Sequence, residues 1–269
     1  MHKIRSILVL FFLSLMHAGV AHAQWVQTNG PYGGMIISFA VSGTNIFAGG
    51  GGVFLSTNNG TSWTETGLTS TWVSALAVSP NGAGGTNLFA GTYGDGVFLS
   101  TNNGASWTAA NTGLTSTYVS SFALSGTNLF AGTYGDGVFL STNNGANWTA
   151  VNTGLTSTSI RALAVSPNGA GGTNLFAGTN GAGVFLSTNN GTSWTAVNNG
   201  LMNTYVRAFV AIGTNLFAGT NGGGIFLSTN NGTSWTATGL TNTEVRALAI
   251  SGTNLFAGTW GGGVWRRPL

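Results

Sequence analysis

The sequence predicts an all-β fold, a six-bladed β-propeller made of four-stranded antiparallel blades. Three observations support this class. One motif recurs about every 41 residues, a spacing typical of propeller blades. Short apolar segments, rich in β-branched and aromatic residues, are separated by glycine-rich turns, which favours strands over helices. A polar octapeptide with an Asn-Gly turn occurs five times.

The repeat is defined by the motif GTNLFAG. The motif or a close variant begins at Gly43, Gly85, Gly126, Gly172, Gly213 and Gly252. Inserts at residues 80–84 and 167–171 are expected to form surface turns. Each repeat holds four strand candidates, which in the fourth copy are residues 160–165, 174–177, 184–186 and 194–197. Their apolar residues are consecutive, which favours sheets covered on both faces, as in blades packed around an axis.

The octapeptide STNNGTSW or a variant begins at Ser56, Ser100, Ser141, Ser187 and Ser228. Asn-Gly between two apolar runs is a strong hairpin signal, because both residues tolerate a left-handed backbone. The serine hydroxyl and the first asparagine side chain can bond nearby backbone groups. The tryptophan then begins the next strand, where its indole can cover the hairpin.

The pattern Ser-x-Asn-x-Gly-x-x-Trp resembles the Asp-box, or BNR repeat, whose usual form has aspartate at the third position. That position here is occupied by Asn58, Asn102, Asn143, Asn189 and Asn230. The resemblance covers nearly the whole chain after residue 23 and implies a propeller of the sialidase-like or sortilin-like superfamily. In that family the box is structural and lies away from the active face, so it does not identify an activity.

The two ends of the chain predict how the ring closes. Trp25 begins a segment that matches a fourth strand with no earlier strands before it, whereas the last copy, residues 245–265, has three strand candidates. We expect residues 25–28 to add to the last blade as its outer strand. Six tryptophan-led strands then give six blades; they begin at Trp25, Trp63, Trp107, Trp148, Trp194 and Trp235.

The first 23 residues have the pattern of a secretory signal peptide. Lys3 and Arg5 precede an apolar run at residues 7–16, and Ala21-His22-Ala23 forms a small-residue cleavage site. The apolar run has about ten residues, and a membrane span needs about twenty. We therefore expect residues 1–23 to be removed after Ala23 and residues 24–269 to form a secreted, periplasmic or cell-surface propeller. A retained membrane anchor is the alternative.

Composition excludes several classes of function. Beyond residue 23 the chain has no histidine, cysteine or lysine, and it has five arginines against four acidic residues. Disulfides, thiolate or ordinary zinc sites and Ser-His-Asp or Cys-His catalysis are therefore excluded. The basic stripe of a nucleic-acid-binding protein is missing, and the glycine-rich loops lack the lysine of a P-loop. We expect no cofactor and no metal site, and we expect a monomer.

Candidate binding residues fall on one predicted rim of the ring, formed by the loop before each first strand and the loop between second and third strands. These loops vary between copies while the framework barely changes. Aromatic rings beside arginine, asparagine and aspartate suit a sugar. The alternative is that these side chains only pack the tops of the blades or act as solubilising charges. The candidates are Trp72, Tyr93, Asp95, Tyr118, Tyr134, Asp136, Arg161, Tyr205, Arg207, Glu244, Arg246 and Trp260.

These observations favour a non-catalytic binding or scaffold module whose partner is a glycan or a cell-surface protein, and no catalytic residue is assigned. The alternative is a glycoside hydrolase of sialidase type. The resemblance implies for such an enzyme an arginine triad, a Tyr/Glu pair and an aspartate acid. Arg161, Arg207 and Arg246 match the triad in number. However, they occupy equivalent repeat positions, and the Arg-Ile-Pro segment typical of these enzymes is absent.

Overall fold

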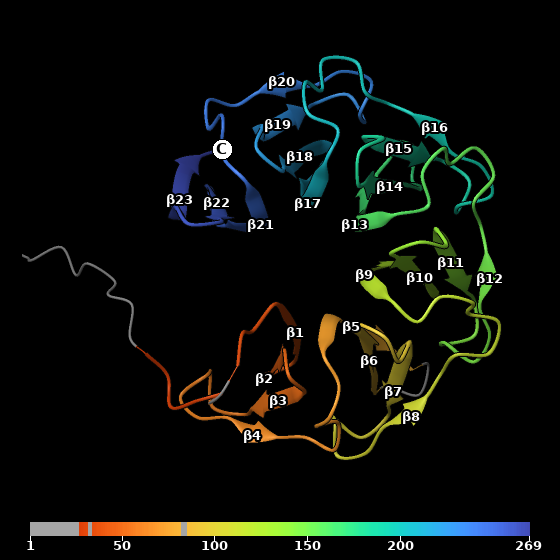
Figure 1. Cartoon of the computed structure of the whole chain (residues 1–269), viewed down its shortest axis with the longest axis vertical. Coiled ribbons are helices and arrows are strands. Elements are labelled where there is room, and N and C mark those ends of the chain that lie inside the picture. Colours follow the sequence, from red (N-terminus) through yellow and green to blue (C-terminus); the bar gives the residue numbers. More distant parts are fainter. Residues whose placement is uncertain (1–26, 32–33, 82–84) are drawn as a thin grey trace, which may run out of the picture.

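The computed structural model describes residues 27–31, 34–81 and 85–269. In these ranges the chain forms 23 strands and no helix. The strands make six antiparallel sheets that stand around a common centre as the blades of a propeller (Figure 1). The predicted all-β, six-bladed fold is confirmed.

Strands pair in chain order within every blade, from the inner first strand to the outer last one. The first three blades consist of β1 (Ser38–Ser42), β2 (Asn45–Gly49), β3 (Val53–Ser56), β4 (Thr64–Glu65), β5 (Val73–Pro80), β6 (Thr86–Thr92), β7 (Val97–Ser100), β8 (Thr108–Ala109), β9 (Val119–Ser125), β10 (Asn128–Thr133), β11 (Val138–Ser141) and β12 (Thr149–Ala150). The last three consist of β13 (Ile160–Pro167), β14 (Thr173–Thr179), β15 (Val184–Ser187), β16 (Thr195–Ala196), β17 (Val206–Ile212), β18 (Asn215–Thr220), β19 (Gly224–Ser228), β20 (Thr236–Ala237), β21 (Val245–Ser251), β22 (Asn254–Thr259) and β23 (Gly263–Pro268).

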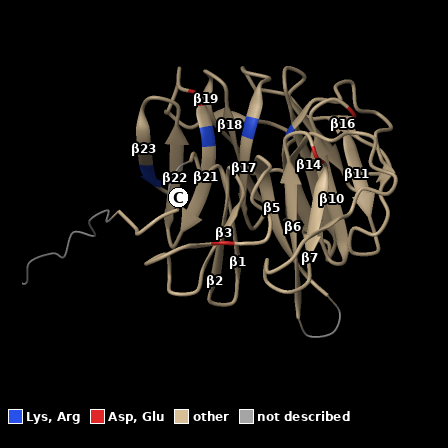
Figure 2. Ribbon diagram, turned by 60° about the horizontal axis from the view of Figure 1, so that its bottom comes forward, with Lys and Arg blue, Asp and Glu red and all other residues tan. Residues whose placement is uncertain are grey.

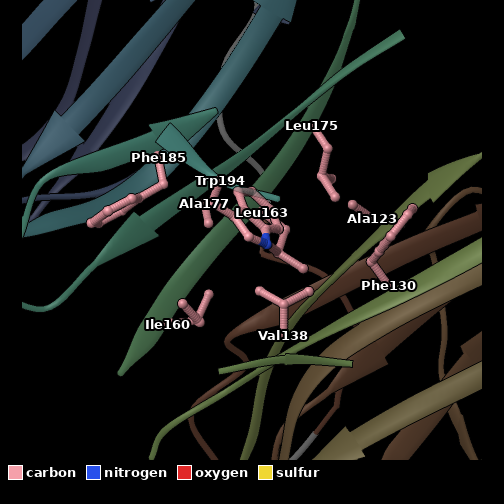
Figure 3. Close-up of a cluster of buried hydrophobic side chains, with 9 residues drawn as sticks. All are labelled: Ala123, Phe130, Val138, Ile160, Leu163, Leu175, Ala177, Phe185 and Trp194. Carbon is pink, nitrogen blue, oxygen red and sulfur yellow. The ribbon is translucent and has the colours of Figure 1, made fainter. Parts of the chain in front are cut away.

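The core lies between neighbouring blades rather than inside any one of them. The second strands, which carry the GTNLFAG motif, are buried on both faces, and Phe89, Phe130 and Phe176 are fully enclosed. In the cluster between the third and fourth blades, Phe130 of one sheet and Phe185 and Trp194 of the next belong to one apolar layer (Figure 3). The consecutive apolar residues of the strands are thus explained by cover from both sides.

Each octapeptide forms the tight hairpin between the third and fourth strands. In the fourth blade, Ser187 Oγ donates to Asn189 Oδ1 (2.9 Å) and accepts from the amide of Gly191 (2.9 Å). Asn189 Oδ1 also accepts from the amide of Ser193 (3.0 Å). Asn190 has a φ of 54°, in the left-handed region that an Asn-Gly turn requires. Equivalent contacts recur in the other four copies.

The tryptophan that ends the octapeptide connects its blade to the preceding one. Its indole N–H donates to the residue that lies three positions after the previous blade's tryptophan. The four observed pairs are Trp107 to Thr66 Oγ1 (3.3 Å), Trp148 to the carbonyl of Ala110 (2.8 Å), Trp194 to the carbonyl of Val151 (2.7 Å) and Trp235 to the carbonyl of Val197 (2.7 Å).

Ring closure by the N-terminal strand is not seen in the described residues. The last blade has three described strands, β21 to β23, and the ring is open between it and β1 (Figure 1). Of the expected closing segment, Trp25 and Val26 lie outside the described residues, as does the predicted signal peptide. Gln27 and Thr28 belong to no strand, and Asn29 pairs instead with Ser62 of the first blade. Within the described ranges, no helix is long and apolar enough to span a bilayer.

Removing the box asparagine will test the hairpin network. Asn189→Ala removes the acceptor for Ser187 and for the amide of Ser193, so we expect the free energy of unfolding to fall by about 1–2 kcal/mol. Asn189→Asp keeps that acceptor and will stay within about 0.5 kcal/mol of the native chain. Urea unfolding measures both changes. Equal losses in the two variants would contradict a role for the oxygen.

Candidate functional site

A β-bulge near the start of the first strand aims one side chain per blade toward the centre. The pairing of first and second strands skips one residue in five blades, so that residue has no cross-strand partner. A bulge of this kind redirects the side chain of the extra residue. The bulged residues are Ser74, Ser120, Arg161, Arg207 and Arg246.

The serines and the arginines use this position differently. Ser120 Oγ lies 3.0 Å from the carbonyl oxygen of Gly132 in its own blade and 2.7 Å from that of Ile160 in the next. Ser74 bridges the second and third blades in the same way. An arginine side chain extends well beyond this backbone junction. The fourth to sixth blades therefore present guanidinium groups at the position where the second and third blades each present a hydroxyl that bonds to the next blade.

These side chains line a central cavity of about 530 Å³ to which all six blades contribute. Residues Met35, Ile36 and Ile37 form its apolar wall on the first blade. Seven of the twelve predicted site residues line it: Tyr93, Tyr118, Tyr134, Arg161, Arg207, Arg246 and Trp260. Residues from the two kinds of variable loop, before each first strand and between second and third strands, are thus brought together at one cavity. Their role in binding remains a prediction.

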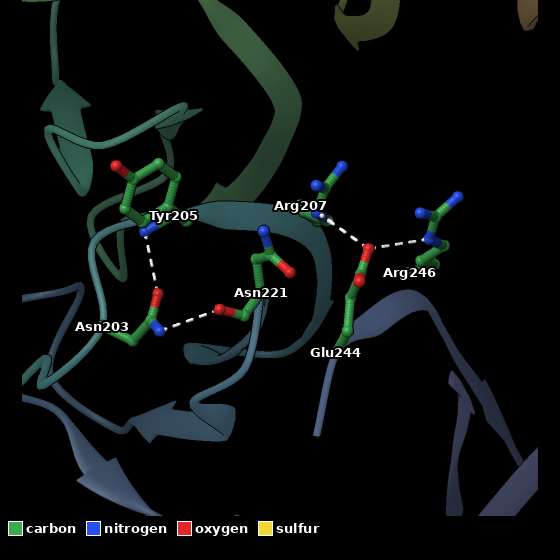
Figure 4. Close-up of polar contacts among 6 residues, drawn as sticks. All are labelled: Asn203, Tyr205, Arg207, Asn221, Glu244 and Arg246. Carbon is green, nitrogen blue, oxygen red and sulfur yellow. Dashed lines mark hydrogen bonds and ion pairs between the residues drawn. The ribbon is translucent and has the colours of Figure 1, made fainter. Parts of the chain in front are cut away.

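Two arginines share one carboxylate. Glu244 Oε1 accepts a hydrogen bond from Arg246 Nε (2.8 Å) and forms an ion pair with Arg207 Nε (3.3 Å), as Figure 4 shows. When the Asn221 side-chain amide is oriented with its nitrogen toward Glu244, this nitrogen donates to Glu244 Oε2 (3.2 Å) and the amide oxygen accepts from Arg207 Nη2 (3.2 Å). Asn203 in turn donates to the carbonyl of Asn221 (2.9 Å) and accepts from the amide of Tyr205 (3.0 Å). The Arg207 side chain is therefore held from two sides.

Aromatic rings cover the guanidinium groups of Arg161 and Arg246. The Arg161 guanidinium carbon lies 4.2 Å from the centre of the Tyr134 ring, and that of Arg246 lies 3.9 Å from the centre of the Trp260 ring. Both distances are within the range of a cation–π interaction. Tyr93 and Tyr118 form an edge-to-face pair with centroids 4.5 Å apart. The cavity thus combines fixed cations with large apolar faces.

The charge of the cavity is positive. Three guanidinium groups line it, and among the described residues the carboxylate that forms ion pairs with two of them is that of Glu244; Figure 2 shows the arginines in blue and the acidic residues in red. Burial lowers the pKa of Arg207 from its ordinary value; Glu244 opposes this change, while the like charges of Arg161 and Arg246 add to it. Arginine stays protonated even so, because its ordinary pKa exceeds 12. The cavity is therefore suited to a ligand that carries negative charge.

The remaining predicted residues surround the cavity without lining it. Glu244, Trp72 and Tyr205 lie in the loops that lead into first strands. Their backbone carbonyls accept hydrogen bonds from backbone amides in the loops between second and third strands. Asp95 and Asp136 accept hydrogen bonds from Thr71 and Thr115, and each bond links the loop between the second and third strands to the loop before the first strand of the same blade. The described ranges contain no group of three or more side chains of the His, Cys, Asp or Glu type that could hold a metal ion.

Sequence analysis did not select Asn203 and Asn221, which organise the polar network around Arg207. The signal at Asn221 was available, because it occupies the same loop position as the selected Tyr93, Tyr134 and Trp260. Asn203 belongs to the loop before β17, where nothing in its residue type indicated that it accepts from the backbone.

No known protein family matches this sequence, and no curated protein matches it. Solved structures match its fold. The extracellular domain of a one-component system from B. thetaiotaomicron is 18% identical, with a TM-score of 0.73; the match covers 89% of this chain and 32% of that chain. YCF48 from Cyanidioschyzon merolae is 16% identical, with a TM-score of 0.66, over 91% of this chain and 85% of that chain.

An ancestral GH74 enzyme is 21% identical, with a TM-score of 0.68, over 91% of this chain and 38% of that chain. This protein therefore spans only about a third of that extracellular domain and of the GH74 enzyme. A further YCF48 structure, 16% identical with a TM-score of 0.65, contains a bound D1 peptide. At these identities the neighbours show a β-propeller fold and no more, and they include both binding and catalytic proteins.

Neutralising Glu244 will test the electrostatics of the cavity. In Glu244→Gln, Arg207 and Arg246 lose their counter-charge, so we expect the free energy of unfolding at low salt to fall by about 1 kcal/mol, and added sulfate to recover much of the loss. Glu65→Gln is the matched control, because Glu65 is exposed and forms no ion pair in the described ranges. A salt-independent loss would contradict the charge argument.

Proposed function

We propose that this protein is an exported, non-catalytic binding propeller whose central cavity takes an acidic carbohydrate of the cell envelope. The observation that carries the proposal is the meeting of three arginines and four aromatic side chains in that single cavity. Aromatic faces stack on the CH groups of a sugar ring, and guanidinium groups bind carboxylate or sulfate oxygens through paired N–H donors.

The rigidity of the cavity supports binding of a defined ligand. Arg161 and Arg246 are already stacked on rings, and Arg207 is held by Glu244 and Asn221. A ligand would therefore meet donors that are largely ordered in advance, which lowers the entropy lost on binding. The guanidinium ends are the part of each arginine available to it, because the Nε atoms of Arg207 and Arg246 face Glu244.

The disposition of the acids supports a non-catalytic role. Glycoside hydrolysis usually requires two carboxylates on either side of the bond to be cleaved. Asp95 and Asp136, two acidic residues of the predicted rim, do not line the central cavity and accept hydrogen bonds from threonines in a neighbouring loop of the same blade. Export rests on the signal-peptide pattern of residues 1–23, which lies outside the described residues.

A glycan array carrying neutral, carboxylated and sulfated saccharides tests the proposal. We expect binding to acidic saccharides. We also expect Arg207→Ala and Trp260→Ala each to raise the dissociation constant by about tenfold or more, as measured by calorimetry. Arg207→Lys will recover part of the loss, since it keeps the charge without the paired donors. Thr149→Ala, on the exposed outer strand β12, is the control.

Two outcomes would overturn the proposal. An array that stays silent with the native protein, or affinity that is unchanged in Arg207→Ala, would remove the carbohydrate ligand. Turnover of a fluorogenic sialoside by the native protein that is lost in Arg207→Ala would instead favour the glycoside-hydrolase alternative.

A further inference from the structure

The last blade contains a second cavity, of about 330 Å³, at the outer edge of β23. We call it the edge cavity. Its apolar walls come from Ile225 and Leu240 of the fifth blade and from Leu255, Ala257 and Trp265 of the sixth. Trp265 is 52% exposed here, whereas Phe185, at the equivalent position of the fourth blade, is 1% exposed. In the fourth blade a group covers this position, and no described residue covers it in the same way in the sixth blade.

In the fourth blade the covering group is an indole. Trp194 belongs to one buried cluster with Val138 of the preceding blade and with Leu175, Ala177 and Phe185 of its own (Figure 3), and Leu155 of the preceding blade packs against this cluster. In the repeat these five positions correspond, in order, to Ile225, Leu255, Ala257, Trp265 and Leu240. The edge cavity therefore has the walls of a tryptophan site but contains no tryptophan from the described residues.

The hydrogen-bond acceptor for that indole is also present. Each observed indole bond goes to the residue three positions after the preceding tryptophan. For the last blade that residue is Thr238, three positions after Trp235. Its carbonyl oxygen accepts instead from Arg267 Nη1, at 3.0 Å. An exposed arginine thus occupies the kind of carbonyl acceptor that an indole uses at three other junctions.

The first blade shows the other half of the same junction. The methyl groups of Val151 and Val197 face the hairpin glycine of the next blade, and the Thr28 methyl faces Gly60 in the same way. Thr28 therefore lies where the residue after an outer strand belongs. Trp63 Nε1, whose acceptor by the repeat would be Thr28, is buried without a hydrogen-bond partner in the described residues.

Apolar side chains at this junction are uncovered as well. Phe39 and Val41 of β1 are 62% and 63% exposed, although Leu163, the equivalent of Phe39 in the fourth blade, is buried. Exposed apolar side chains that are contiguous on one sheet face usually mark an interface. Among the described residues, the face of β1 and the edge of β23 thus both lack a partner, at the two sides of the same opening.

We propose that the edge cavity is the receptor for the side chain of Trp25, and that Val26 and Gln27 of the same chain pair with β23 and draw the last blade against the first. The indole then donates to the carbonyl of Thr238 and displaces Arg267. By the register of β15 with β16, in which Leu186 pairs with Thr195, Val26 pairs with Arg266. The occupant follows from Thr28, since Trp25 precedes it by the three residues that the repeat requires.

Disulfide trapping tests this register, because the chain has no cysteine of its own. The exported chain carrying Val26→Cys and Arg266→Cys, treated with oxidised glutathione, is expected to lose two thiols and form a disulfide within one chain. The pair Val26→Cys and Val264→Cys, displaced by two residues along β23, is the matched control and is expected to stay largely reduced. Thiol counting and non-reducing electrophoresis give the result.

Thermal unfolding provides the second test. Trp25→Ala is expected to lower Tm by about 10 °C, as for a tryptophan removed from a packed site, and Trp25→Phe by less. Met202→Ala, at an exposed side chain, is the control. An unchanged Tm in Trp25→Ala would overturn the proposal. A disulfide that links two chains would also overturn it, in favour of strand exchange between copies.

Discussion

The structure depends on one repeated interaction, the indole that reaches from one blade to the blade before it and is observed at four junctions. A tryptophan at the start of a fourth strand fills the space between two sheets and donates its N–H to a fixed position of the preceding blade. Because this chain has neither disulfides nor a dense charge network, burial and such hydrogen bonds supply its cohesion. The hairpin that precedes each tryptophan sets its direction.

Most of the fold could be predicted from the sequence, because the sequence repeats. Six copies of one pattern give six estimates of the same strands, and the Asn-Gly turns identify the hairpins independently. The hydrogen-bond acceptor of the indole could not be predicted, because it depends on how two sheets pack and not on local turn chemistry. Closure of the ring depends on contacts far apart in the chain, and for it the sequence gives only a count of strands at the two ends.

The candidate site was predicted less completely. Variation between copies selected one rim of the ring, and seven of the chosen residues line the central cavity. It could not separate side chains that face the centre from those that support loops, such as Asp95 and Asp136. That distinction comes from the bulge, a change in strand pairing that leaves no sign in residue type. Glu244 was selected as a ligand contact, whereas the structure shows it as the shared counter-ion of two arginines.

The bulge separates the chemistry of the protein from its architecture. Its residue has no cross-strand partner, so a replacement there alters the lining of the ring while the inter-sheet apolar layer stays intact. Serine occupies this site in two blades and arginine in three. The neighbouring valine or isoleucine stays buried in each of these five blades. A duplicated scaffold of this kind can acquire a new preference through a few independent exchanges, one blade at a time.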